Sequence, residues 1–184
     1  MNNQSRTLIA RAVCFTAVLC AIAAAGLGFT VTLWVFVLPS PALAWIAITD
    51  HRTHRIPVNL SHTAIGLTAA GVTIAAQWNA GPAGQHILQS TAIGAVIFPT
   101  LLGVLWLIAP TQIGFGDVRL SISLGLIVGV ANPALVPATA ALACVLAALQ
   151  MLTLGSGPWS TRTIGFAPAL IAATYTLPAL IAAT

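Results

Sequence analysis

The sequence predicts an all-α, polytopic membrane protein with about seven membrane-spanning helices. Hydrophobic residues make up 59% of the 184 residues and charged residues only 4%, a balance that is typical of polytopic membrane proteins. Apolar runs recur along the whole chain between short polar or Gly/Pro-rich segments, and one span needs about 20 apolar residues. Because this length leaves little beyond spans and short loops, we expect a single membrane-embedded domain over residues 1–184.

The first half of the chain is predicted to contain three spans. An apolar run from Leu8 to about Gly28 comes first, and a second run covers about Val31 to Thr49. Pro39-Ser40-Pro41 interrupts the second run and should kink it, which membranes tolerate when neighbouring helices or hydroxyl groups satisfy the freed carbonyls. The polar stretch 50–57 follows, and a third run spans about Asn59 to Trp78.

Four more spans are predicted in the second half. The segment 79–85 is rich in Gly and Pro and predicts a loop. The four apolar runs cover about Ile87–Ala109, Val118–Ala131, Ala134–Leu154 and Ile164–Thr184. The run that begins at Val118 would reach only about 21 Å, against about 30 Å of hydrocarbon. We therefore expect Asp117, just before this run, to lie below the membrane surface.

The arginines predict the orientation of the chain. Alternate crossings place all of them on one side of the membrane: Arg6, Arg11, Arg52, Arg55, Arg119 and Arg162. The positive-inside rule assigns that side, with the N-terminus, to the cytoplasm and leaves the C-terminus outside. The first run can alternatively be read as a signal peptide, and its cleavage would leave six spans with the same orientation.

Charge and cysteine content limit the classes of function. The net charge of +4 comes from arginines and reports topology in a membrane protein, so nucleic-acid binding is not expected. Cys14, Cys20 and Cys144 lie in apolar runs, and their odd number and the absence of a CxxC pair indicate neither a disulfide framework nor a zinc site. We expect no metal and no cofactor.

Asp50 and Asp117 are the only two acidic residues of the chain. An ionisable group at membrane depth is costly, and the crossings bring both carboxylates to the same membrane face. Two such groups close enough to share a proton form an aspartic dyad, in which one draws a proton from water while the other polarises a carbonyl. Gly114 and Gly116 beside Asp117 permit unusual backbone angles and the close approach of a substrate strand.

Each aspartate also has a purely structural interpretation. Asp117 is a suitable N-cap for the helix that follows it, and Asp50 could be a loop carboxylate neutralised by Arg52 or Arg55. Stability alone, however, gives no reason to place the only two acids at one face, each bordered by arginine. The pair together therefore favours catalysis.

Three segments carry a resemblance to a known family. Asp50 is followed by Arg55-Ile56-Pro57, and after two intervening spans comes Gly114-Phe115-Gly116-Asp117-Val118-Arg119-Leu120. The third segment is Ile164-Gly165-Phe166-Ala167-Pro168, at the start of the last span. From about residue 45 to the C-terminus the chain resembles the prepilin peptidase family, the GxGD-type aspartic peptidases of type IV pilus and related secretion systems. Residues 1–30 would then be an extra N-terminal helix before a peptidase core at 31–184.

The resemblance implies a membrane aspartic endopeptidase. It would remove the leader peptide from prepilin-like precursors (pilin, pseudopilin or Flp-type) at the cytoplasmic face of the inner or plasma membrane. Asp50 and Asp117 would be the catalytic residues, and the partners would be these substrates and the lipid bilayer. The supporting or substrate-binding residues would be Gly114, Phe115, Gly116, Arg119, Arg55, Pro57, Asn59, Phe166 and Pro168.

The chain departs from the family pattern at several points. Val58 separates Asn59 from the Ile-Pro pair, Arg119 replaces a frequent lysine, and Ala167 stands where glycine is common. Larger family members carry a cytoplasmic insertion with paired cysteines that bind zinc, which is associated with methylation of the new pilin N-terminus. This chain resembles a short form without that insertion, so we expect no methyltransferase activity.

Two other classes compete with this interpretation. The presenilin and signal-peptide-peptidase group also has a GxGD aspartate and a later Pro-Ala-Leu, but its aspartates lie on consecutive helices, whereas two spans separate them here. A small cation- or proton-coupled transporter subunit would use the same two carboxylates for ion binding, which suits sites nearer the bilayer midplane. A structural subunit without chemistry is the remaining alternative.

Overall fold

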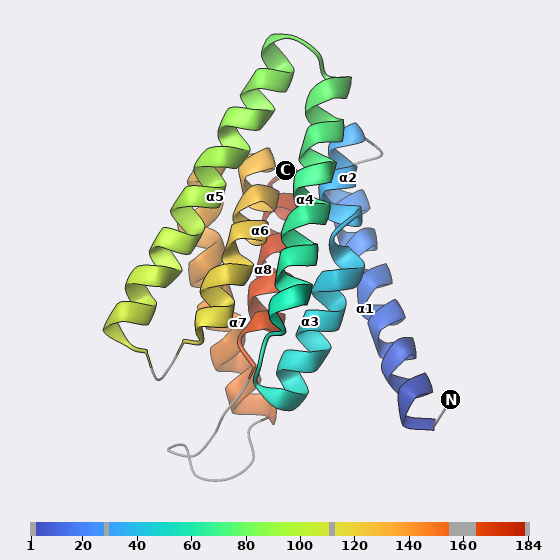
Figure 1. Cartoon of the computed structure of the whole chain (residues 1–184), viewed down its shortest axis with the longest axis vertical. Helices are drawn as coiled ribbons and strands as arrows, with labels where there is room; N and C mark the ends of the chain where they lie inside the picture. Colours follow the sequence, from blue (N-terminus) through green and yellow to red (C-terminus); the bar gives the residue numbers. More distant parts are fainter. Residues whose placement is uncertain (1–2, 28–29, 111–112, 155–164, 183–184) are drawn as a thin grey trace.

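The computed structural model describes residues 3–27, 30–110, 113–154 and 165–182, and these are helical nearly throughout (Figure 1). No strand occurs within these ranges, so the prediction of an all-α protein is confirmed. The α-helices are α1 (Asn3–Leu27), α2 (Trp34–Val37), α3 (Ser40–Thr53), α4 (Val58–Trp78), α5 (Pro82–Ile108), α6 (Phe115–Ala131), α7 (Val136–Leu154) and α8 (Ala167–Ala182), and the 3₁₀ helices are η1 (Val31–Leu33) and η2 (Pro133–Leu135).

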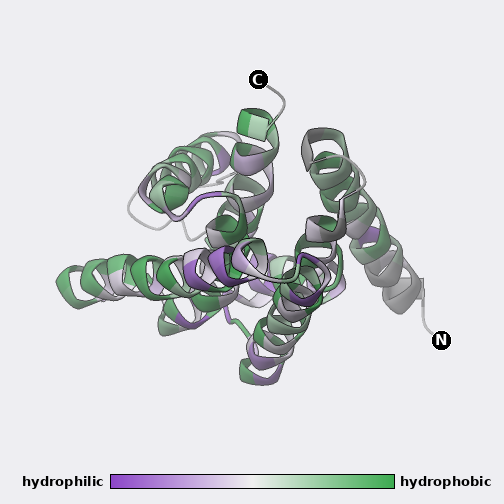
Figure 2. Cartoon of the chain, turned by 90° about the horizontal axis from the view of Figure 1, so that it is seen from above, coloured by the Kyte–Doolittle hydropathy of each residue, from purple (hydrophilic) through white to green (hydrophobic). Residues whose placement is uncertain are grey.

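Several of these helices are suited to a membrane. In the described part of the chain, three are long and apolar enough to cross one: Val58–Trp78, Pro82–Ile108 and Pro133–Thr153. Ala10–Ala25 and Ala167–Ala182 are apolar but shorter. Hydrophobic residues also cover the outward faces of the helices (Figure 2). The structure supports a membrane protein, while the count of seven spans stays a prediction.

Two helix boundaries differ from those predicted. The segment 79–85 is not a loop throughout, because α5 begins at Pro82, directly after Gly81 with its φ of 78°. Proline suits the first position of a helix, where its missing N–H would have no partner. Likewise α6 begins at Phe115 rather than Val118, so Asp117 lies inside its first turn.

The second run is interrupted at the proline pair, as the sequence predicts: α2 ends at Val37 and α3 begins at Ser40. Pro41 lacks the N–H that would reach the carbonyl of Val37, and the hydroxyl of Ser40 donates to that carbonyl instead at 2.7 Å. The hydroxyl of buried Tyr175, on α8, donates to the carbonyl of Phe36 at 2.6 Å. Hydroxyl groups therefore donate hydrogen bonds to the carbonyls at the helix break, and the Tyr175 hydroxyl links α2 to α8.

Small residues bring α5 and α6 into backbone contact. A Cβ atom on Gly94 would overlap the carbonyl oxygen of Gly125, and one on Gly129 would lie 2.7 Å from the carbonyl oxygen of Ser90. On the other side of α6, the hydroxyl groups of Thr68 (α4) and Ser123 lie 2.7 Å apart. Small residues and hydroxyl pairs are the usual means of packing helices in membranes.

The helix ends that matter for function lie at one end of the bundle. Figure 1 shows the C-terminal end of α3 and the N-terminal ends of α6 and α8 at its lower end. The N-terminus lies toward the same end and the C-terminus toward the opposite one. Asp50 and Asp117 therefore lie at the same end of the molecule, as the alternation of crossings predicts.

Gly125→Ala should destabilise the protein by about 1–3 kcal/mol, because the added methyl group overlaps the backbone of α5. Gly66→Ala is the matched control, since the same methyl group on α4 meets nothing within 4 Å. That control should shift stability by less than about 1 kcal/mol. Denaturant unfolding in detergent micelles measures both free energies, and equal effects of the two substitutions would contradict the packing described.

Candidate active site

Asp50 lies in the last turn of α3 and is only 5% exposed. Its Oδ2 atom accepts a hydrogen bond of 3.0 Å from the backbone N–H of Ala167, the first residue of α8. The first N–H groups of a helix have no partner within it and carry the positive end of the helix dipole. Asp50 therefore caps α8 from another helix, and α8 holds the carboxyl group in place.

Gly165 makes this contact possible. It is buried directly before α8, and a Cβ atom at this position would overlap Oδ2 of Asp50 and lie 3.0 Å from the backbone carbonyl carbon of Asp50. Any other residue type would have to displace the carboxyl group or the start of α8. The close approach of α3 and α8 thus depends on a residue without a side chain.

Asp117 is held within its own helix. It is 7% exposed, and its Oδ2 atom accepts a 3.2 Å hydrogen bond from the N–H of Gly114. Its own N–H donates to the Gly114 carbonyl at 3.0 Å. Its other oxygen, Oδ1, is buried and has no hydrogen-bond partner among the described residues. A buried polar atom without a partner is rare and commonly marks a functional group.

The structural interpretations of the two aspartates have different outcomes. Gly114 rather than Asp117 is the N-cap of α6, but Asp117 caps the helix from the third helical position, because its side chain accepts a hydrogen bond from the N–H of Gly114. No ion pair joins Asp50 to Arg52 or Arg55 in the described part of the chain, where both arginines are exposed. Neither carboxyl group is therefore explained as half of a surface ion pair.

The two carboxyl groups are near enough to interact electrostatically. The segment after α3 also lies against α6, since a Cβ atom on Gly116 would be 3.0 Å from the Cβ atom of Ile56. His51 and His54, exposed beside Asp50, interact electrostatically with its carboxyl group. The described residues contain no group of three His, Cys, Asp or Glu side chains that could hold a metal ion.

Two of the predicted supporting residues form a cluster on the outer side of α6. Phe115 is 54% exposed, and its ring packs edge-on against Trp106 with the ring centres 5.5 Å apart. The guanidinium of Arg119 lies 5.4 Å from the centre of the Phe115 ring, a cation–π contact. This cluster packs around the first turns of α6, and none of the hydrogen bonds described for the two aspartates comes from it.

The remaining predicted residues flank the aspartates. Pro57 is the N-cap of α4, and Arg55 and Asn59 beside it are exposed. Phe166 packs against the hydrophobic core, and Pro168 in the first turn of α8 lines a cavity beside α3. Ile164, which begins the third segment of the resemblance, lies outside the described residues, as does Arg162.

Sequence reasoning missed Gly165, Ala167 and Ile56 as parts of the site. The first two lie in the Ile164–Pro168 segment, but their contributions are a missing side chain and a backbone N–H, which residue type alone does not reveal. The inward orientation of Asp50, in contrast, could have been recognised from the sequence. Asp50 extends a stripe of buried residues at helical spacing, formed by Leu43, Ile46 and Ala47, and so points into the bundle.

One of the comparisons with known proteins found a match. Residues 36–152 match the model of the type IV leader peptidase family. The match contains both aspartates and the Gly114–Leu120 segment and ends before Gly165. Searches among curated proteins and among solved structures gave no match. Because the matched region covers more than half of the sequence, the chain belongs to the type IV leader peptidase family.

Proposed function

We propose that the protein is a membrane aspartic endopeptidase that removes the leader peptide from type IV prepilin-like precursors. The observation that carries this proposal is the pair of buried carboxyl groups, Asp50 and Asp117, at one end of the bundle. Each is held by a backbone N–H, and within the described residues neither forms an ion pair with an arginine. Membership of a peptidase family supports hydrolysis of a peptide bond as the chemistry.

In this proposal the two aspartates share one proton. Two carboxyl groups that interact and are removed from water do not readily ionise together, so a single shared proton is favoured. In the proposal that proton, or the water that the ionised carboxylate activates, is the partner of the buried Oδ1 of Asp117. The dyad then titrates as a unit, and we do not assign the proton to one residue.

Hydrolysis then follows from proton transfers within the pair. The ionised carboxylate takes a proton from water as the water oxygen attacks the scissile carbonyl carbon. The protonated carboxyl group gives its proton to the carbonyl oxygen, which avoids a full negative charge on the intermediate. The C–N bond breaks as the leaving nitrogen receives a proton from the first carboxyl group. One hydroxyl group of the tetrahedral intermediate returns its proton to the second carboxylate as the carbonyl re-forms, so the pair again holds one proton.

The proposed location is the cytoplasmic face of the inner or plasma membrane. Arg52, Arg55 and Arg119 lie at the same end of the bundle as the aspartates, and the N-terminal end of α1 points there too. The positive-inside rule assigns such an end to the cytoplasm. The substrates would be pilin, pseudopilin or Flp-type precursors, and we propose a peptidase without methyltransferase activity.

Asp50→Asn and Asp117→Asn should each reduce leader cleavage of a co-expressed prepilin by at least about a hundredfold, because neither amide can transfer the shared proton. Both variants should still insert and accumulate, since asparagine keeps the shape and one accepting oxygen. Immunoblotting of precursor and product measures the cleavage.

His86→Gln, exposed near the opposite end of the bundle, is the matched control and should cleave at the wild-type rate. Processing that survives either aspartate substitution would refute the peptidase. Loss of proton or cation flux with intact processing would favour the transporter instead.

Gly165→Ala should lower the cleavage rate and stability together, because its methyl group overlaps the Asp50 carboxyl group. In the Asp50→Ala background the same change should cost less unfolding free energy, by at least about 0.5 kcal/mol, since the shortened side chain leaves room for it. Denaturant unfolding of the four proteins of this double-mutant cycle measures the coupling. If the two substitutions changed the free energy of unfolding additively, Gly165 would not position Asp50.

Reporter fusions should show the two ends of the bundle on opposite sides of the membrane. Alkaline phosphatase, which is active only outside the cytoplasm, should be active when fused after Ala80 or after Thr184 and inactive when fused after His54. The arginine distribution is the physical reason for this orientation. The reverse pattern would place the aspartates outside and contradict the proposed location.

A further inference from the structure

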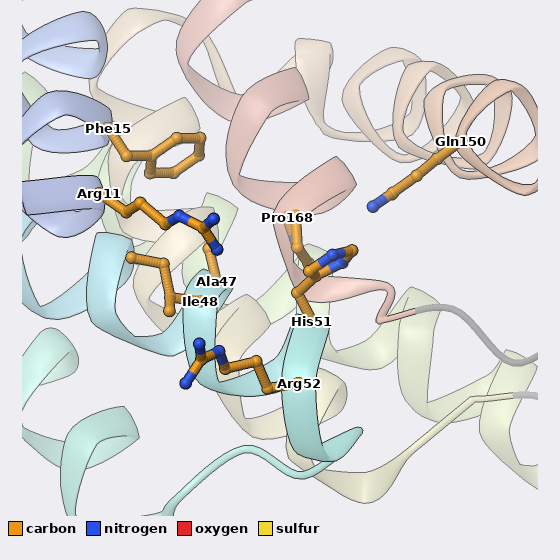
Figure 3. A pocket seen from close by; sticks show the side chains of 8 residues that line it. All are labelled: Arg11, Phe15, Ala47, Ile48, His51, Arg52, Gln150 and Pro168. Atoms are coloured by element: carbon orange, nitrogen blue, oxygen red, sulfur yellow. The ribbon is translucent and has the colours of Figure 1, made fainter. Parts of the chain in front are cut away.

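A cavity of about 250 Å³ opens beside the catalytic end of α3 and is shared by α1, α3, α7 and α8. Its polar lining is formed by Arg11 of α1, His51 and Arg52 of α3, and Gln150 of α7 (Figure 3). Figure 3 shows these side chains coming from three helices, with Pro168 of α8 among them; Arg52 extends away from His51 and Gln150. His51 and Arg52 directly follow Asp50, yet neither takes part in the catalysis proposed above.

The surface of the cavity is almost entirely apolar, but two exposed arginines, Arg11 and Arg52, are among the residues that line it. Arg11 and Arg52 have no ion-pair partner among the described residues, and the chain contains no acid besides Asp50 and Asp117. Both of those carboxyl groups are committed to backbone N–H groups elsewhere. Two arginines around one cavity, without a protein anion, form a site for an anion that comes from outside the chain, and guanidinium groups suit phosphate oxygens particularly well.

The rest of the cavity is apolar. Phe15 lies one helical turn from Arg11 on α1, and Ile48 lies one turn from Arg52 on α3, so each arginine has an apolar neighbour on the same helix face. Both of these apolar side chains line the cavity and are only partly buried. A free inorganic anion would make no use of them, whereas a lipid carries a phosphate and an acyl chain in the same molecule.

We infer that this cavity binds one anionic phospholipid, with its phosphate between Arg11 and Arg52 and an acyl chain along Phe15 and Ile48. The position suits such a ligand, since the cavity lies at the end of the bundle where the arginines gather and where anionic headgroups attract basic residues. The bound lipid joins α1 to α3 and α8, which carry Asp50 and the N–H that holds it. The site does not depend on the proposed peptidase activity.

Native mass spectrometry of the full chain, released from phosphatidylcholine vesicles with and without phosphatidylglycerol, tests the inference. The wild-type protein should retain one phosphatidylglycerol molecule and little phosphatidylcholine. The Arg11→Gln/Arg52→Gln variant should bind phosphatidylglycerol about tenfold or more weakly, because both charged donors are lost. Its thermal unfolding in neutral detergent should match that of the wild type, which shows that the fold survives.

Arg55→Gln/Arg119→Gln is the matched control, because it also removes two positive charges from the same end of the molecule but neither residue lines the cavity. It should bind phosphatidylglycerol as the wild type does. An equal loss in this control would overturn the site in favour of diffuse surface attraction. Phe15→Ser should also weaken binding, and inorganic phosphate should not displace the lipid. Displacement by phosphate alone, or Arg11- and Arg52-dependent binding of an acidic peptide instead of lipid, would each refute the lipid assignment.

Discussion

The hydrogen bond from the N–H of Ala167 to the carboxyl group of Asp50 is the contact on which the arrangement of the catalytic end depends. A carboxylate near the C-terminal end of α3 faces the negative end of that helix's dipole, which disfavours it. The N-terminal end of α8 supplies the opposite partial charge and a donor that would otherwise be buried without a partner. One contact therefore compensates for two unfavourable features, and Gly165 is the residue that lets the two chain segments approach closely enough.

The carboxyl group of Asp117 is held by contacts within its own helix. Asp117 and Gly114 bond to each other in both directions within one turn, so the position of Asp117 is fixed as soon as α6 forms. Asp50, in contrast, is fixed only after the last helix has packed against α3. One carboxyl group is thus held by a local contact and the other by a contact that requires the packed bundle.

Much of this architecture follows from patterns of side chains. Hydropathy predicts the helices, Pro39-Ser40-Pro41 predicts the break between α2 and α3, and the alternation of crossings places both aspartates at one end. The Gly114–Asp117 turn was recognisable because glycine and aspartate are rare among apolar runs. The contacts that hold Asp50 were not predictable in the same way. They consist of a backbone N–H and an absent Cβ atom, and both depend on how α8 docks rather than on the type of residue.

The incorrect predictions at the start of α5 and for the partner of Asp50 also arise because packing between helices decides the outcome. The sequence 79–85 combines Gly and Pro as loops do, but a proline directly after a glycine equally well begins a helix, and tertiary packing of α4 on α5 decides between the two. Asp50 was open to pairing with Arg52 or Arg55 because sequence neighbours are the nearest available cations. Helical spacing turns Asp50 inward and leaves both arginines exposed, so the pairing does not form.

The glycine contact between α5 and α6 joins the helix that carries Asp117 to the longest helix among the described residues. With 27 residues, α5 is about 40 Å long, well beyond the roughly 30 Å of a hydrocarbon core, and a helix of that length tilts to fit. Because its backbone is locked against α6, the tilt of α5 is passed to the helix that carries Asp117. Asp50 belongs to α3 and α8, which do not share that contact. We therefore expect α5 and α6 to change their tilt together in a bilayer of different thickness.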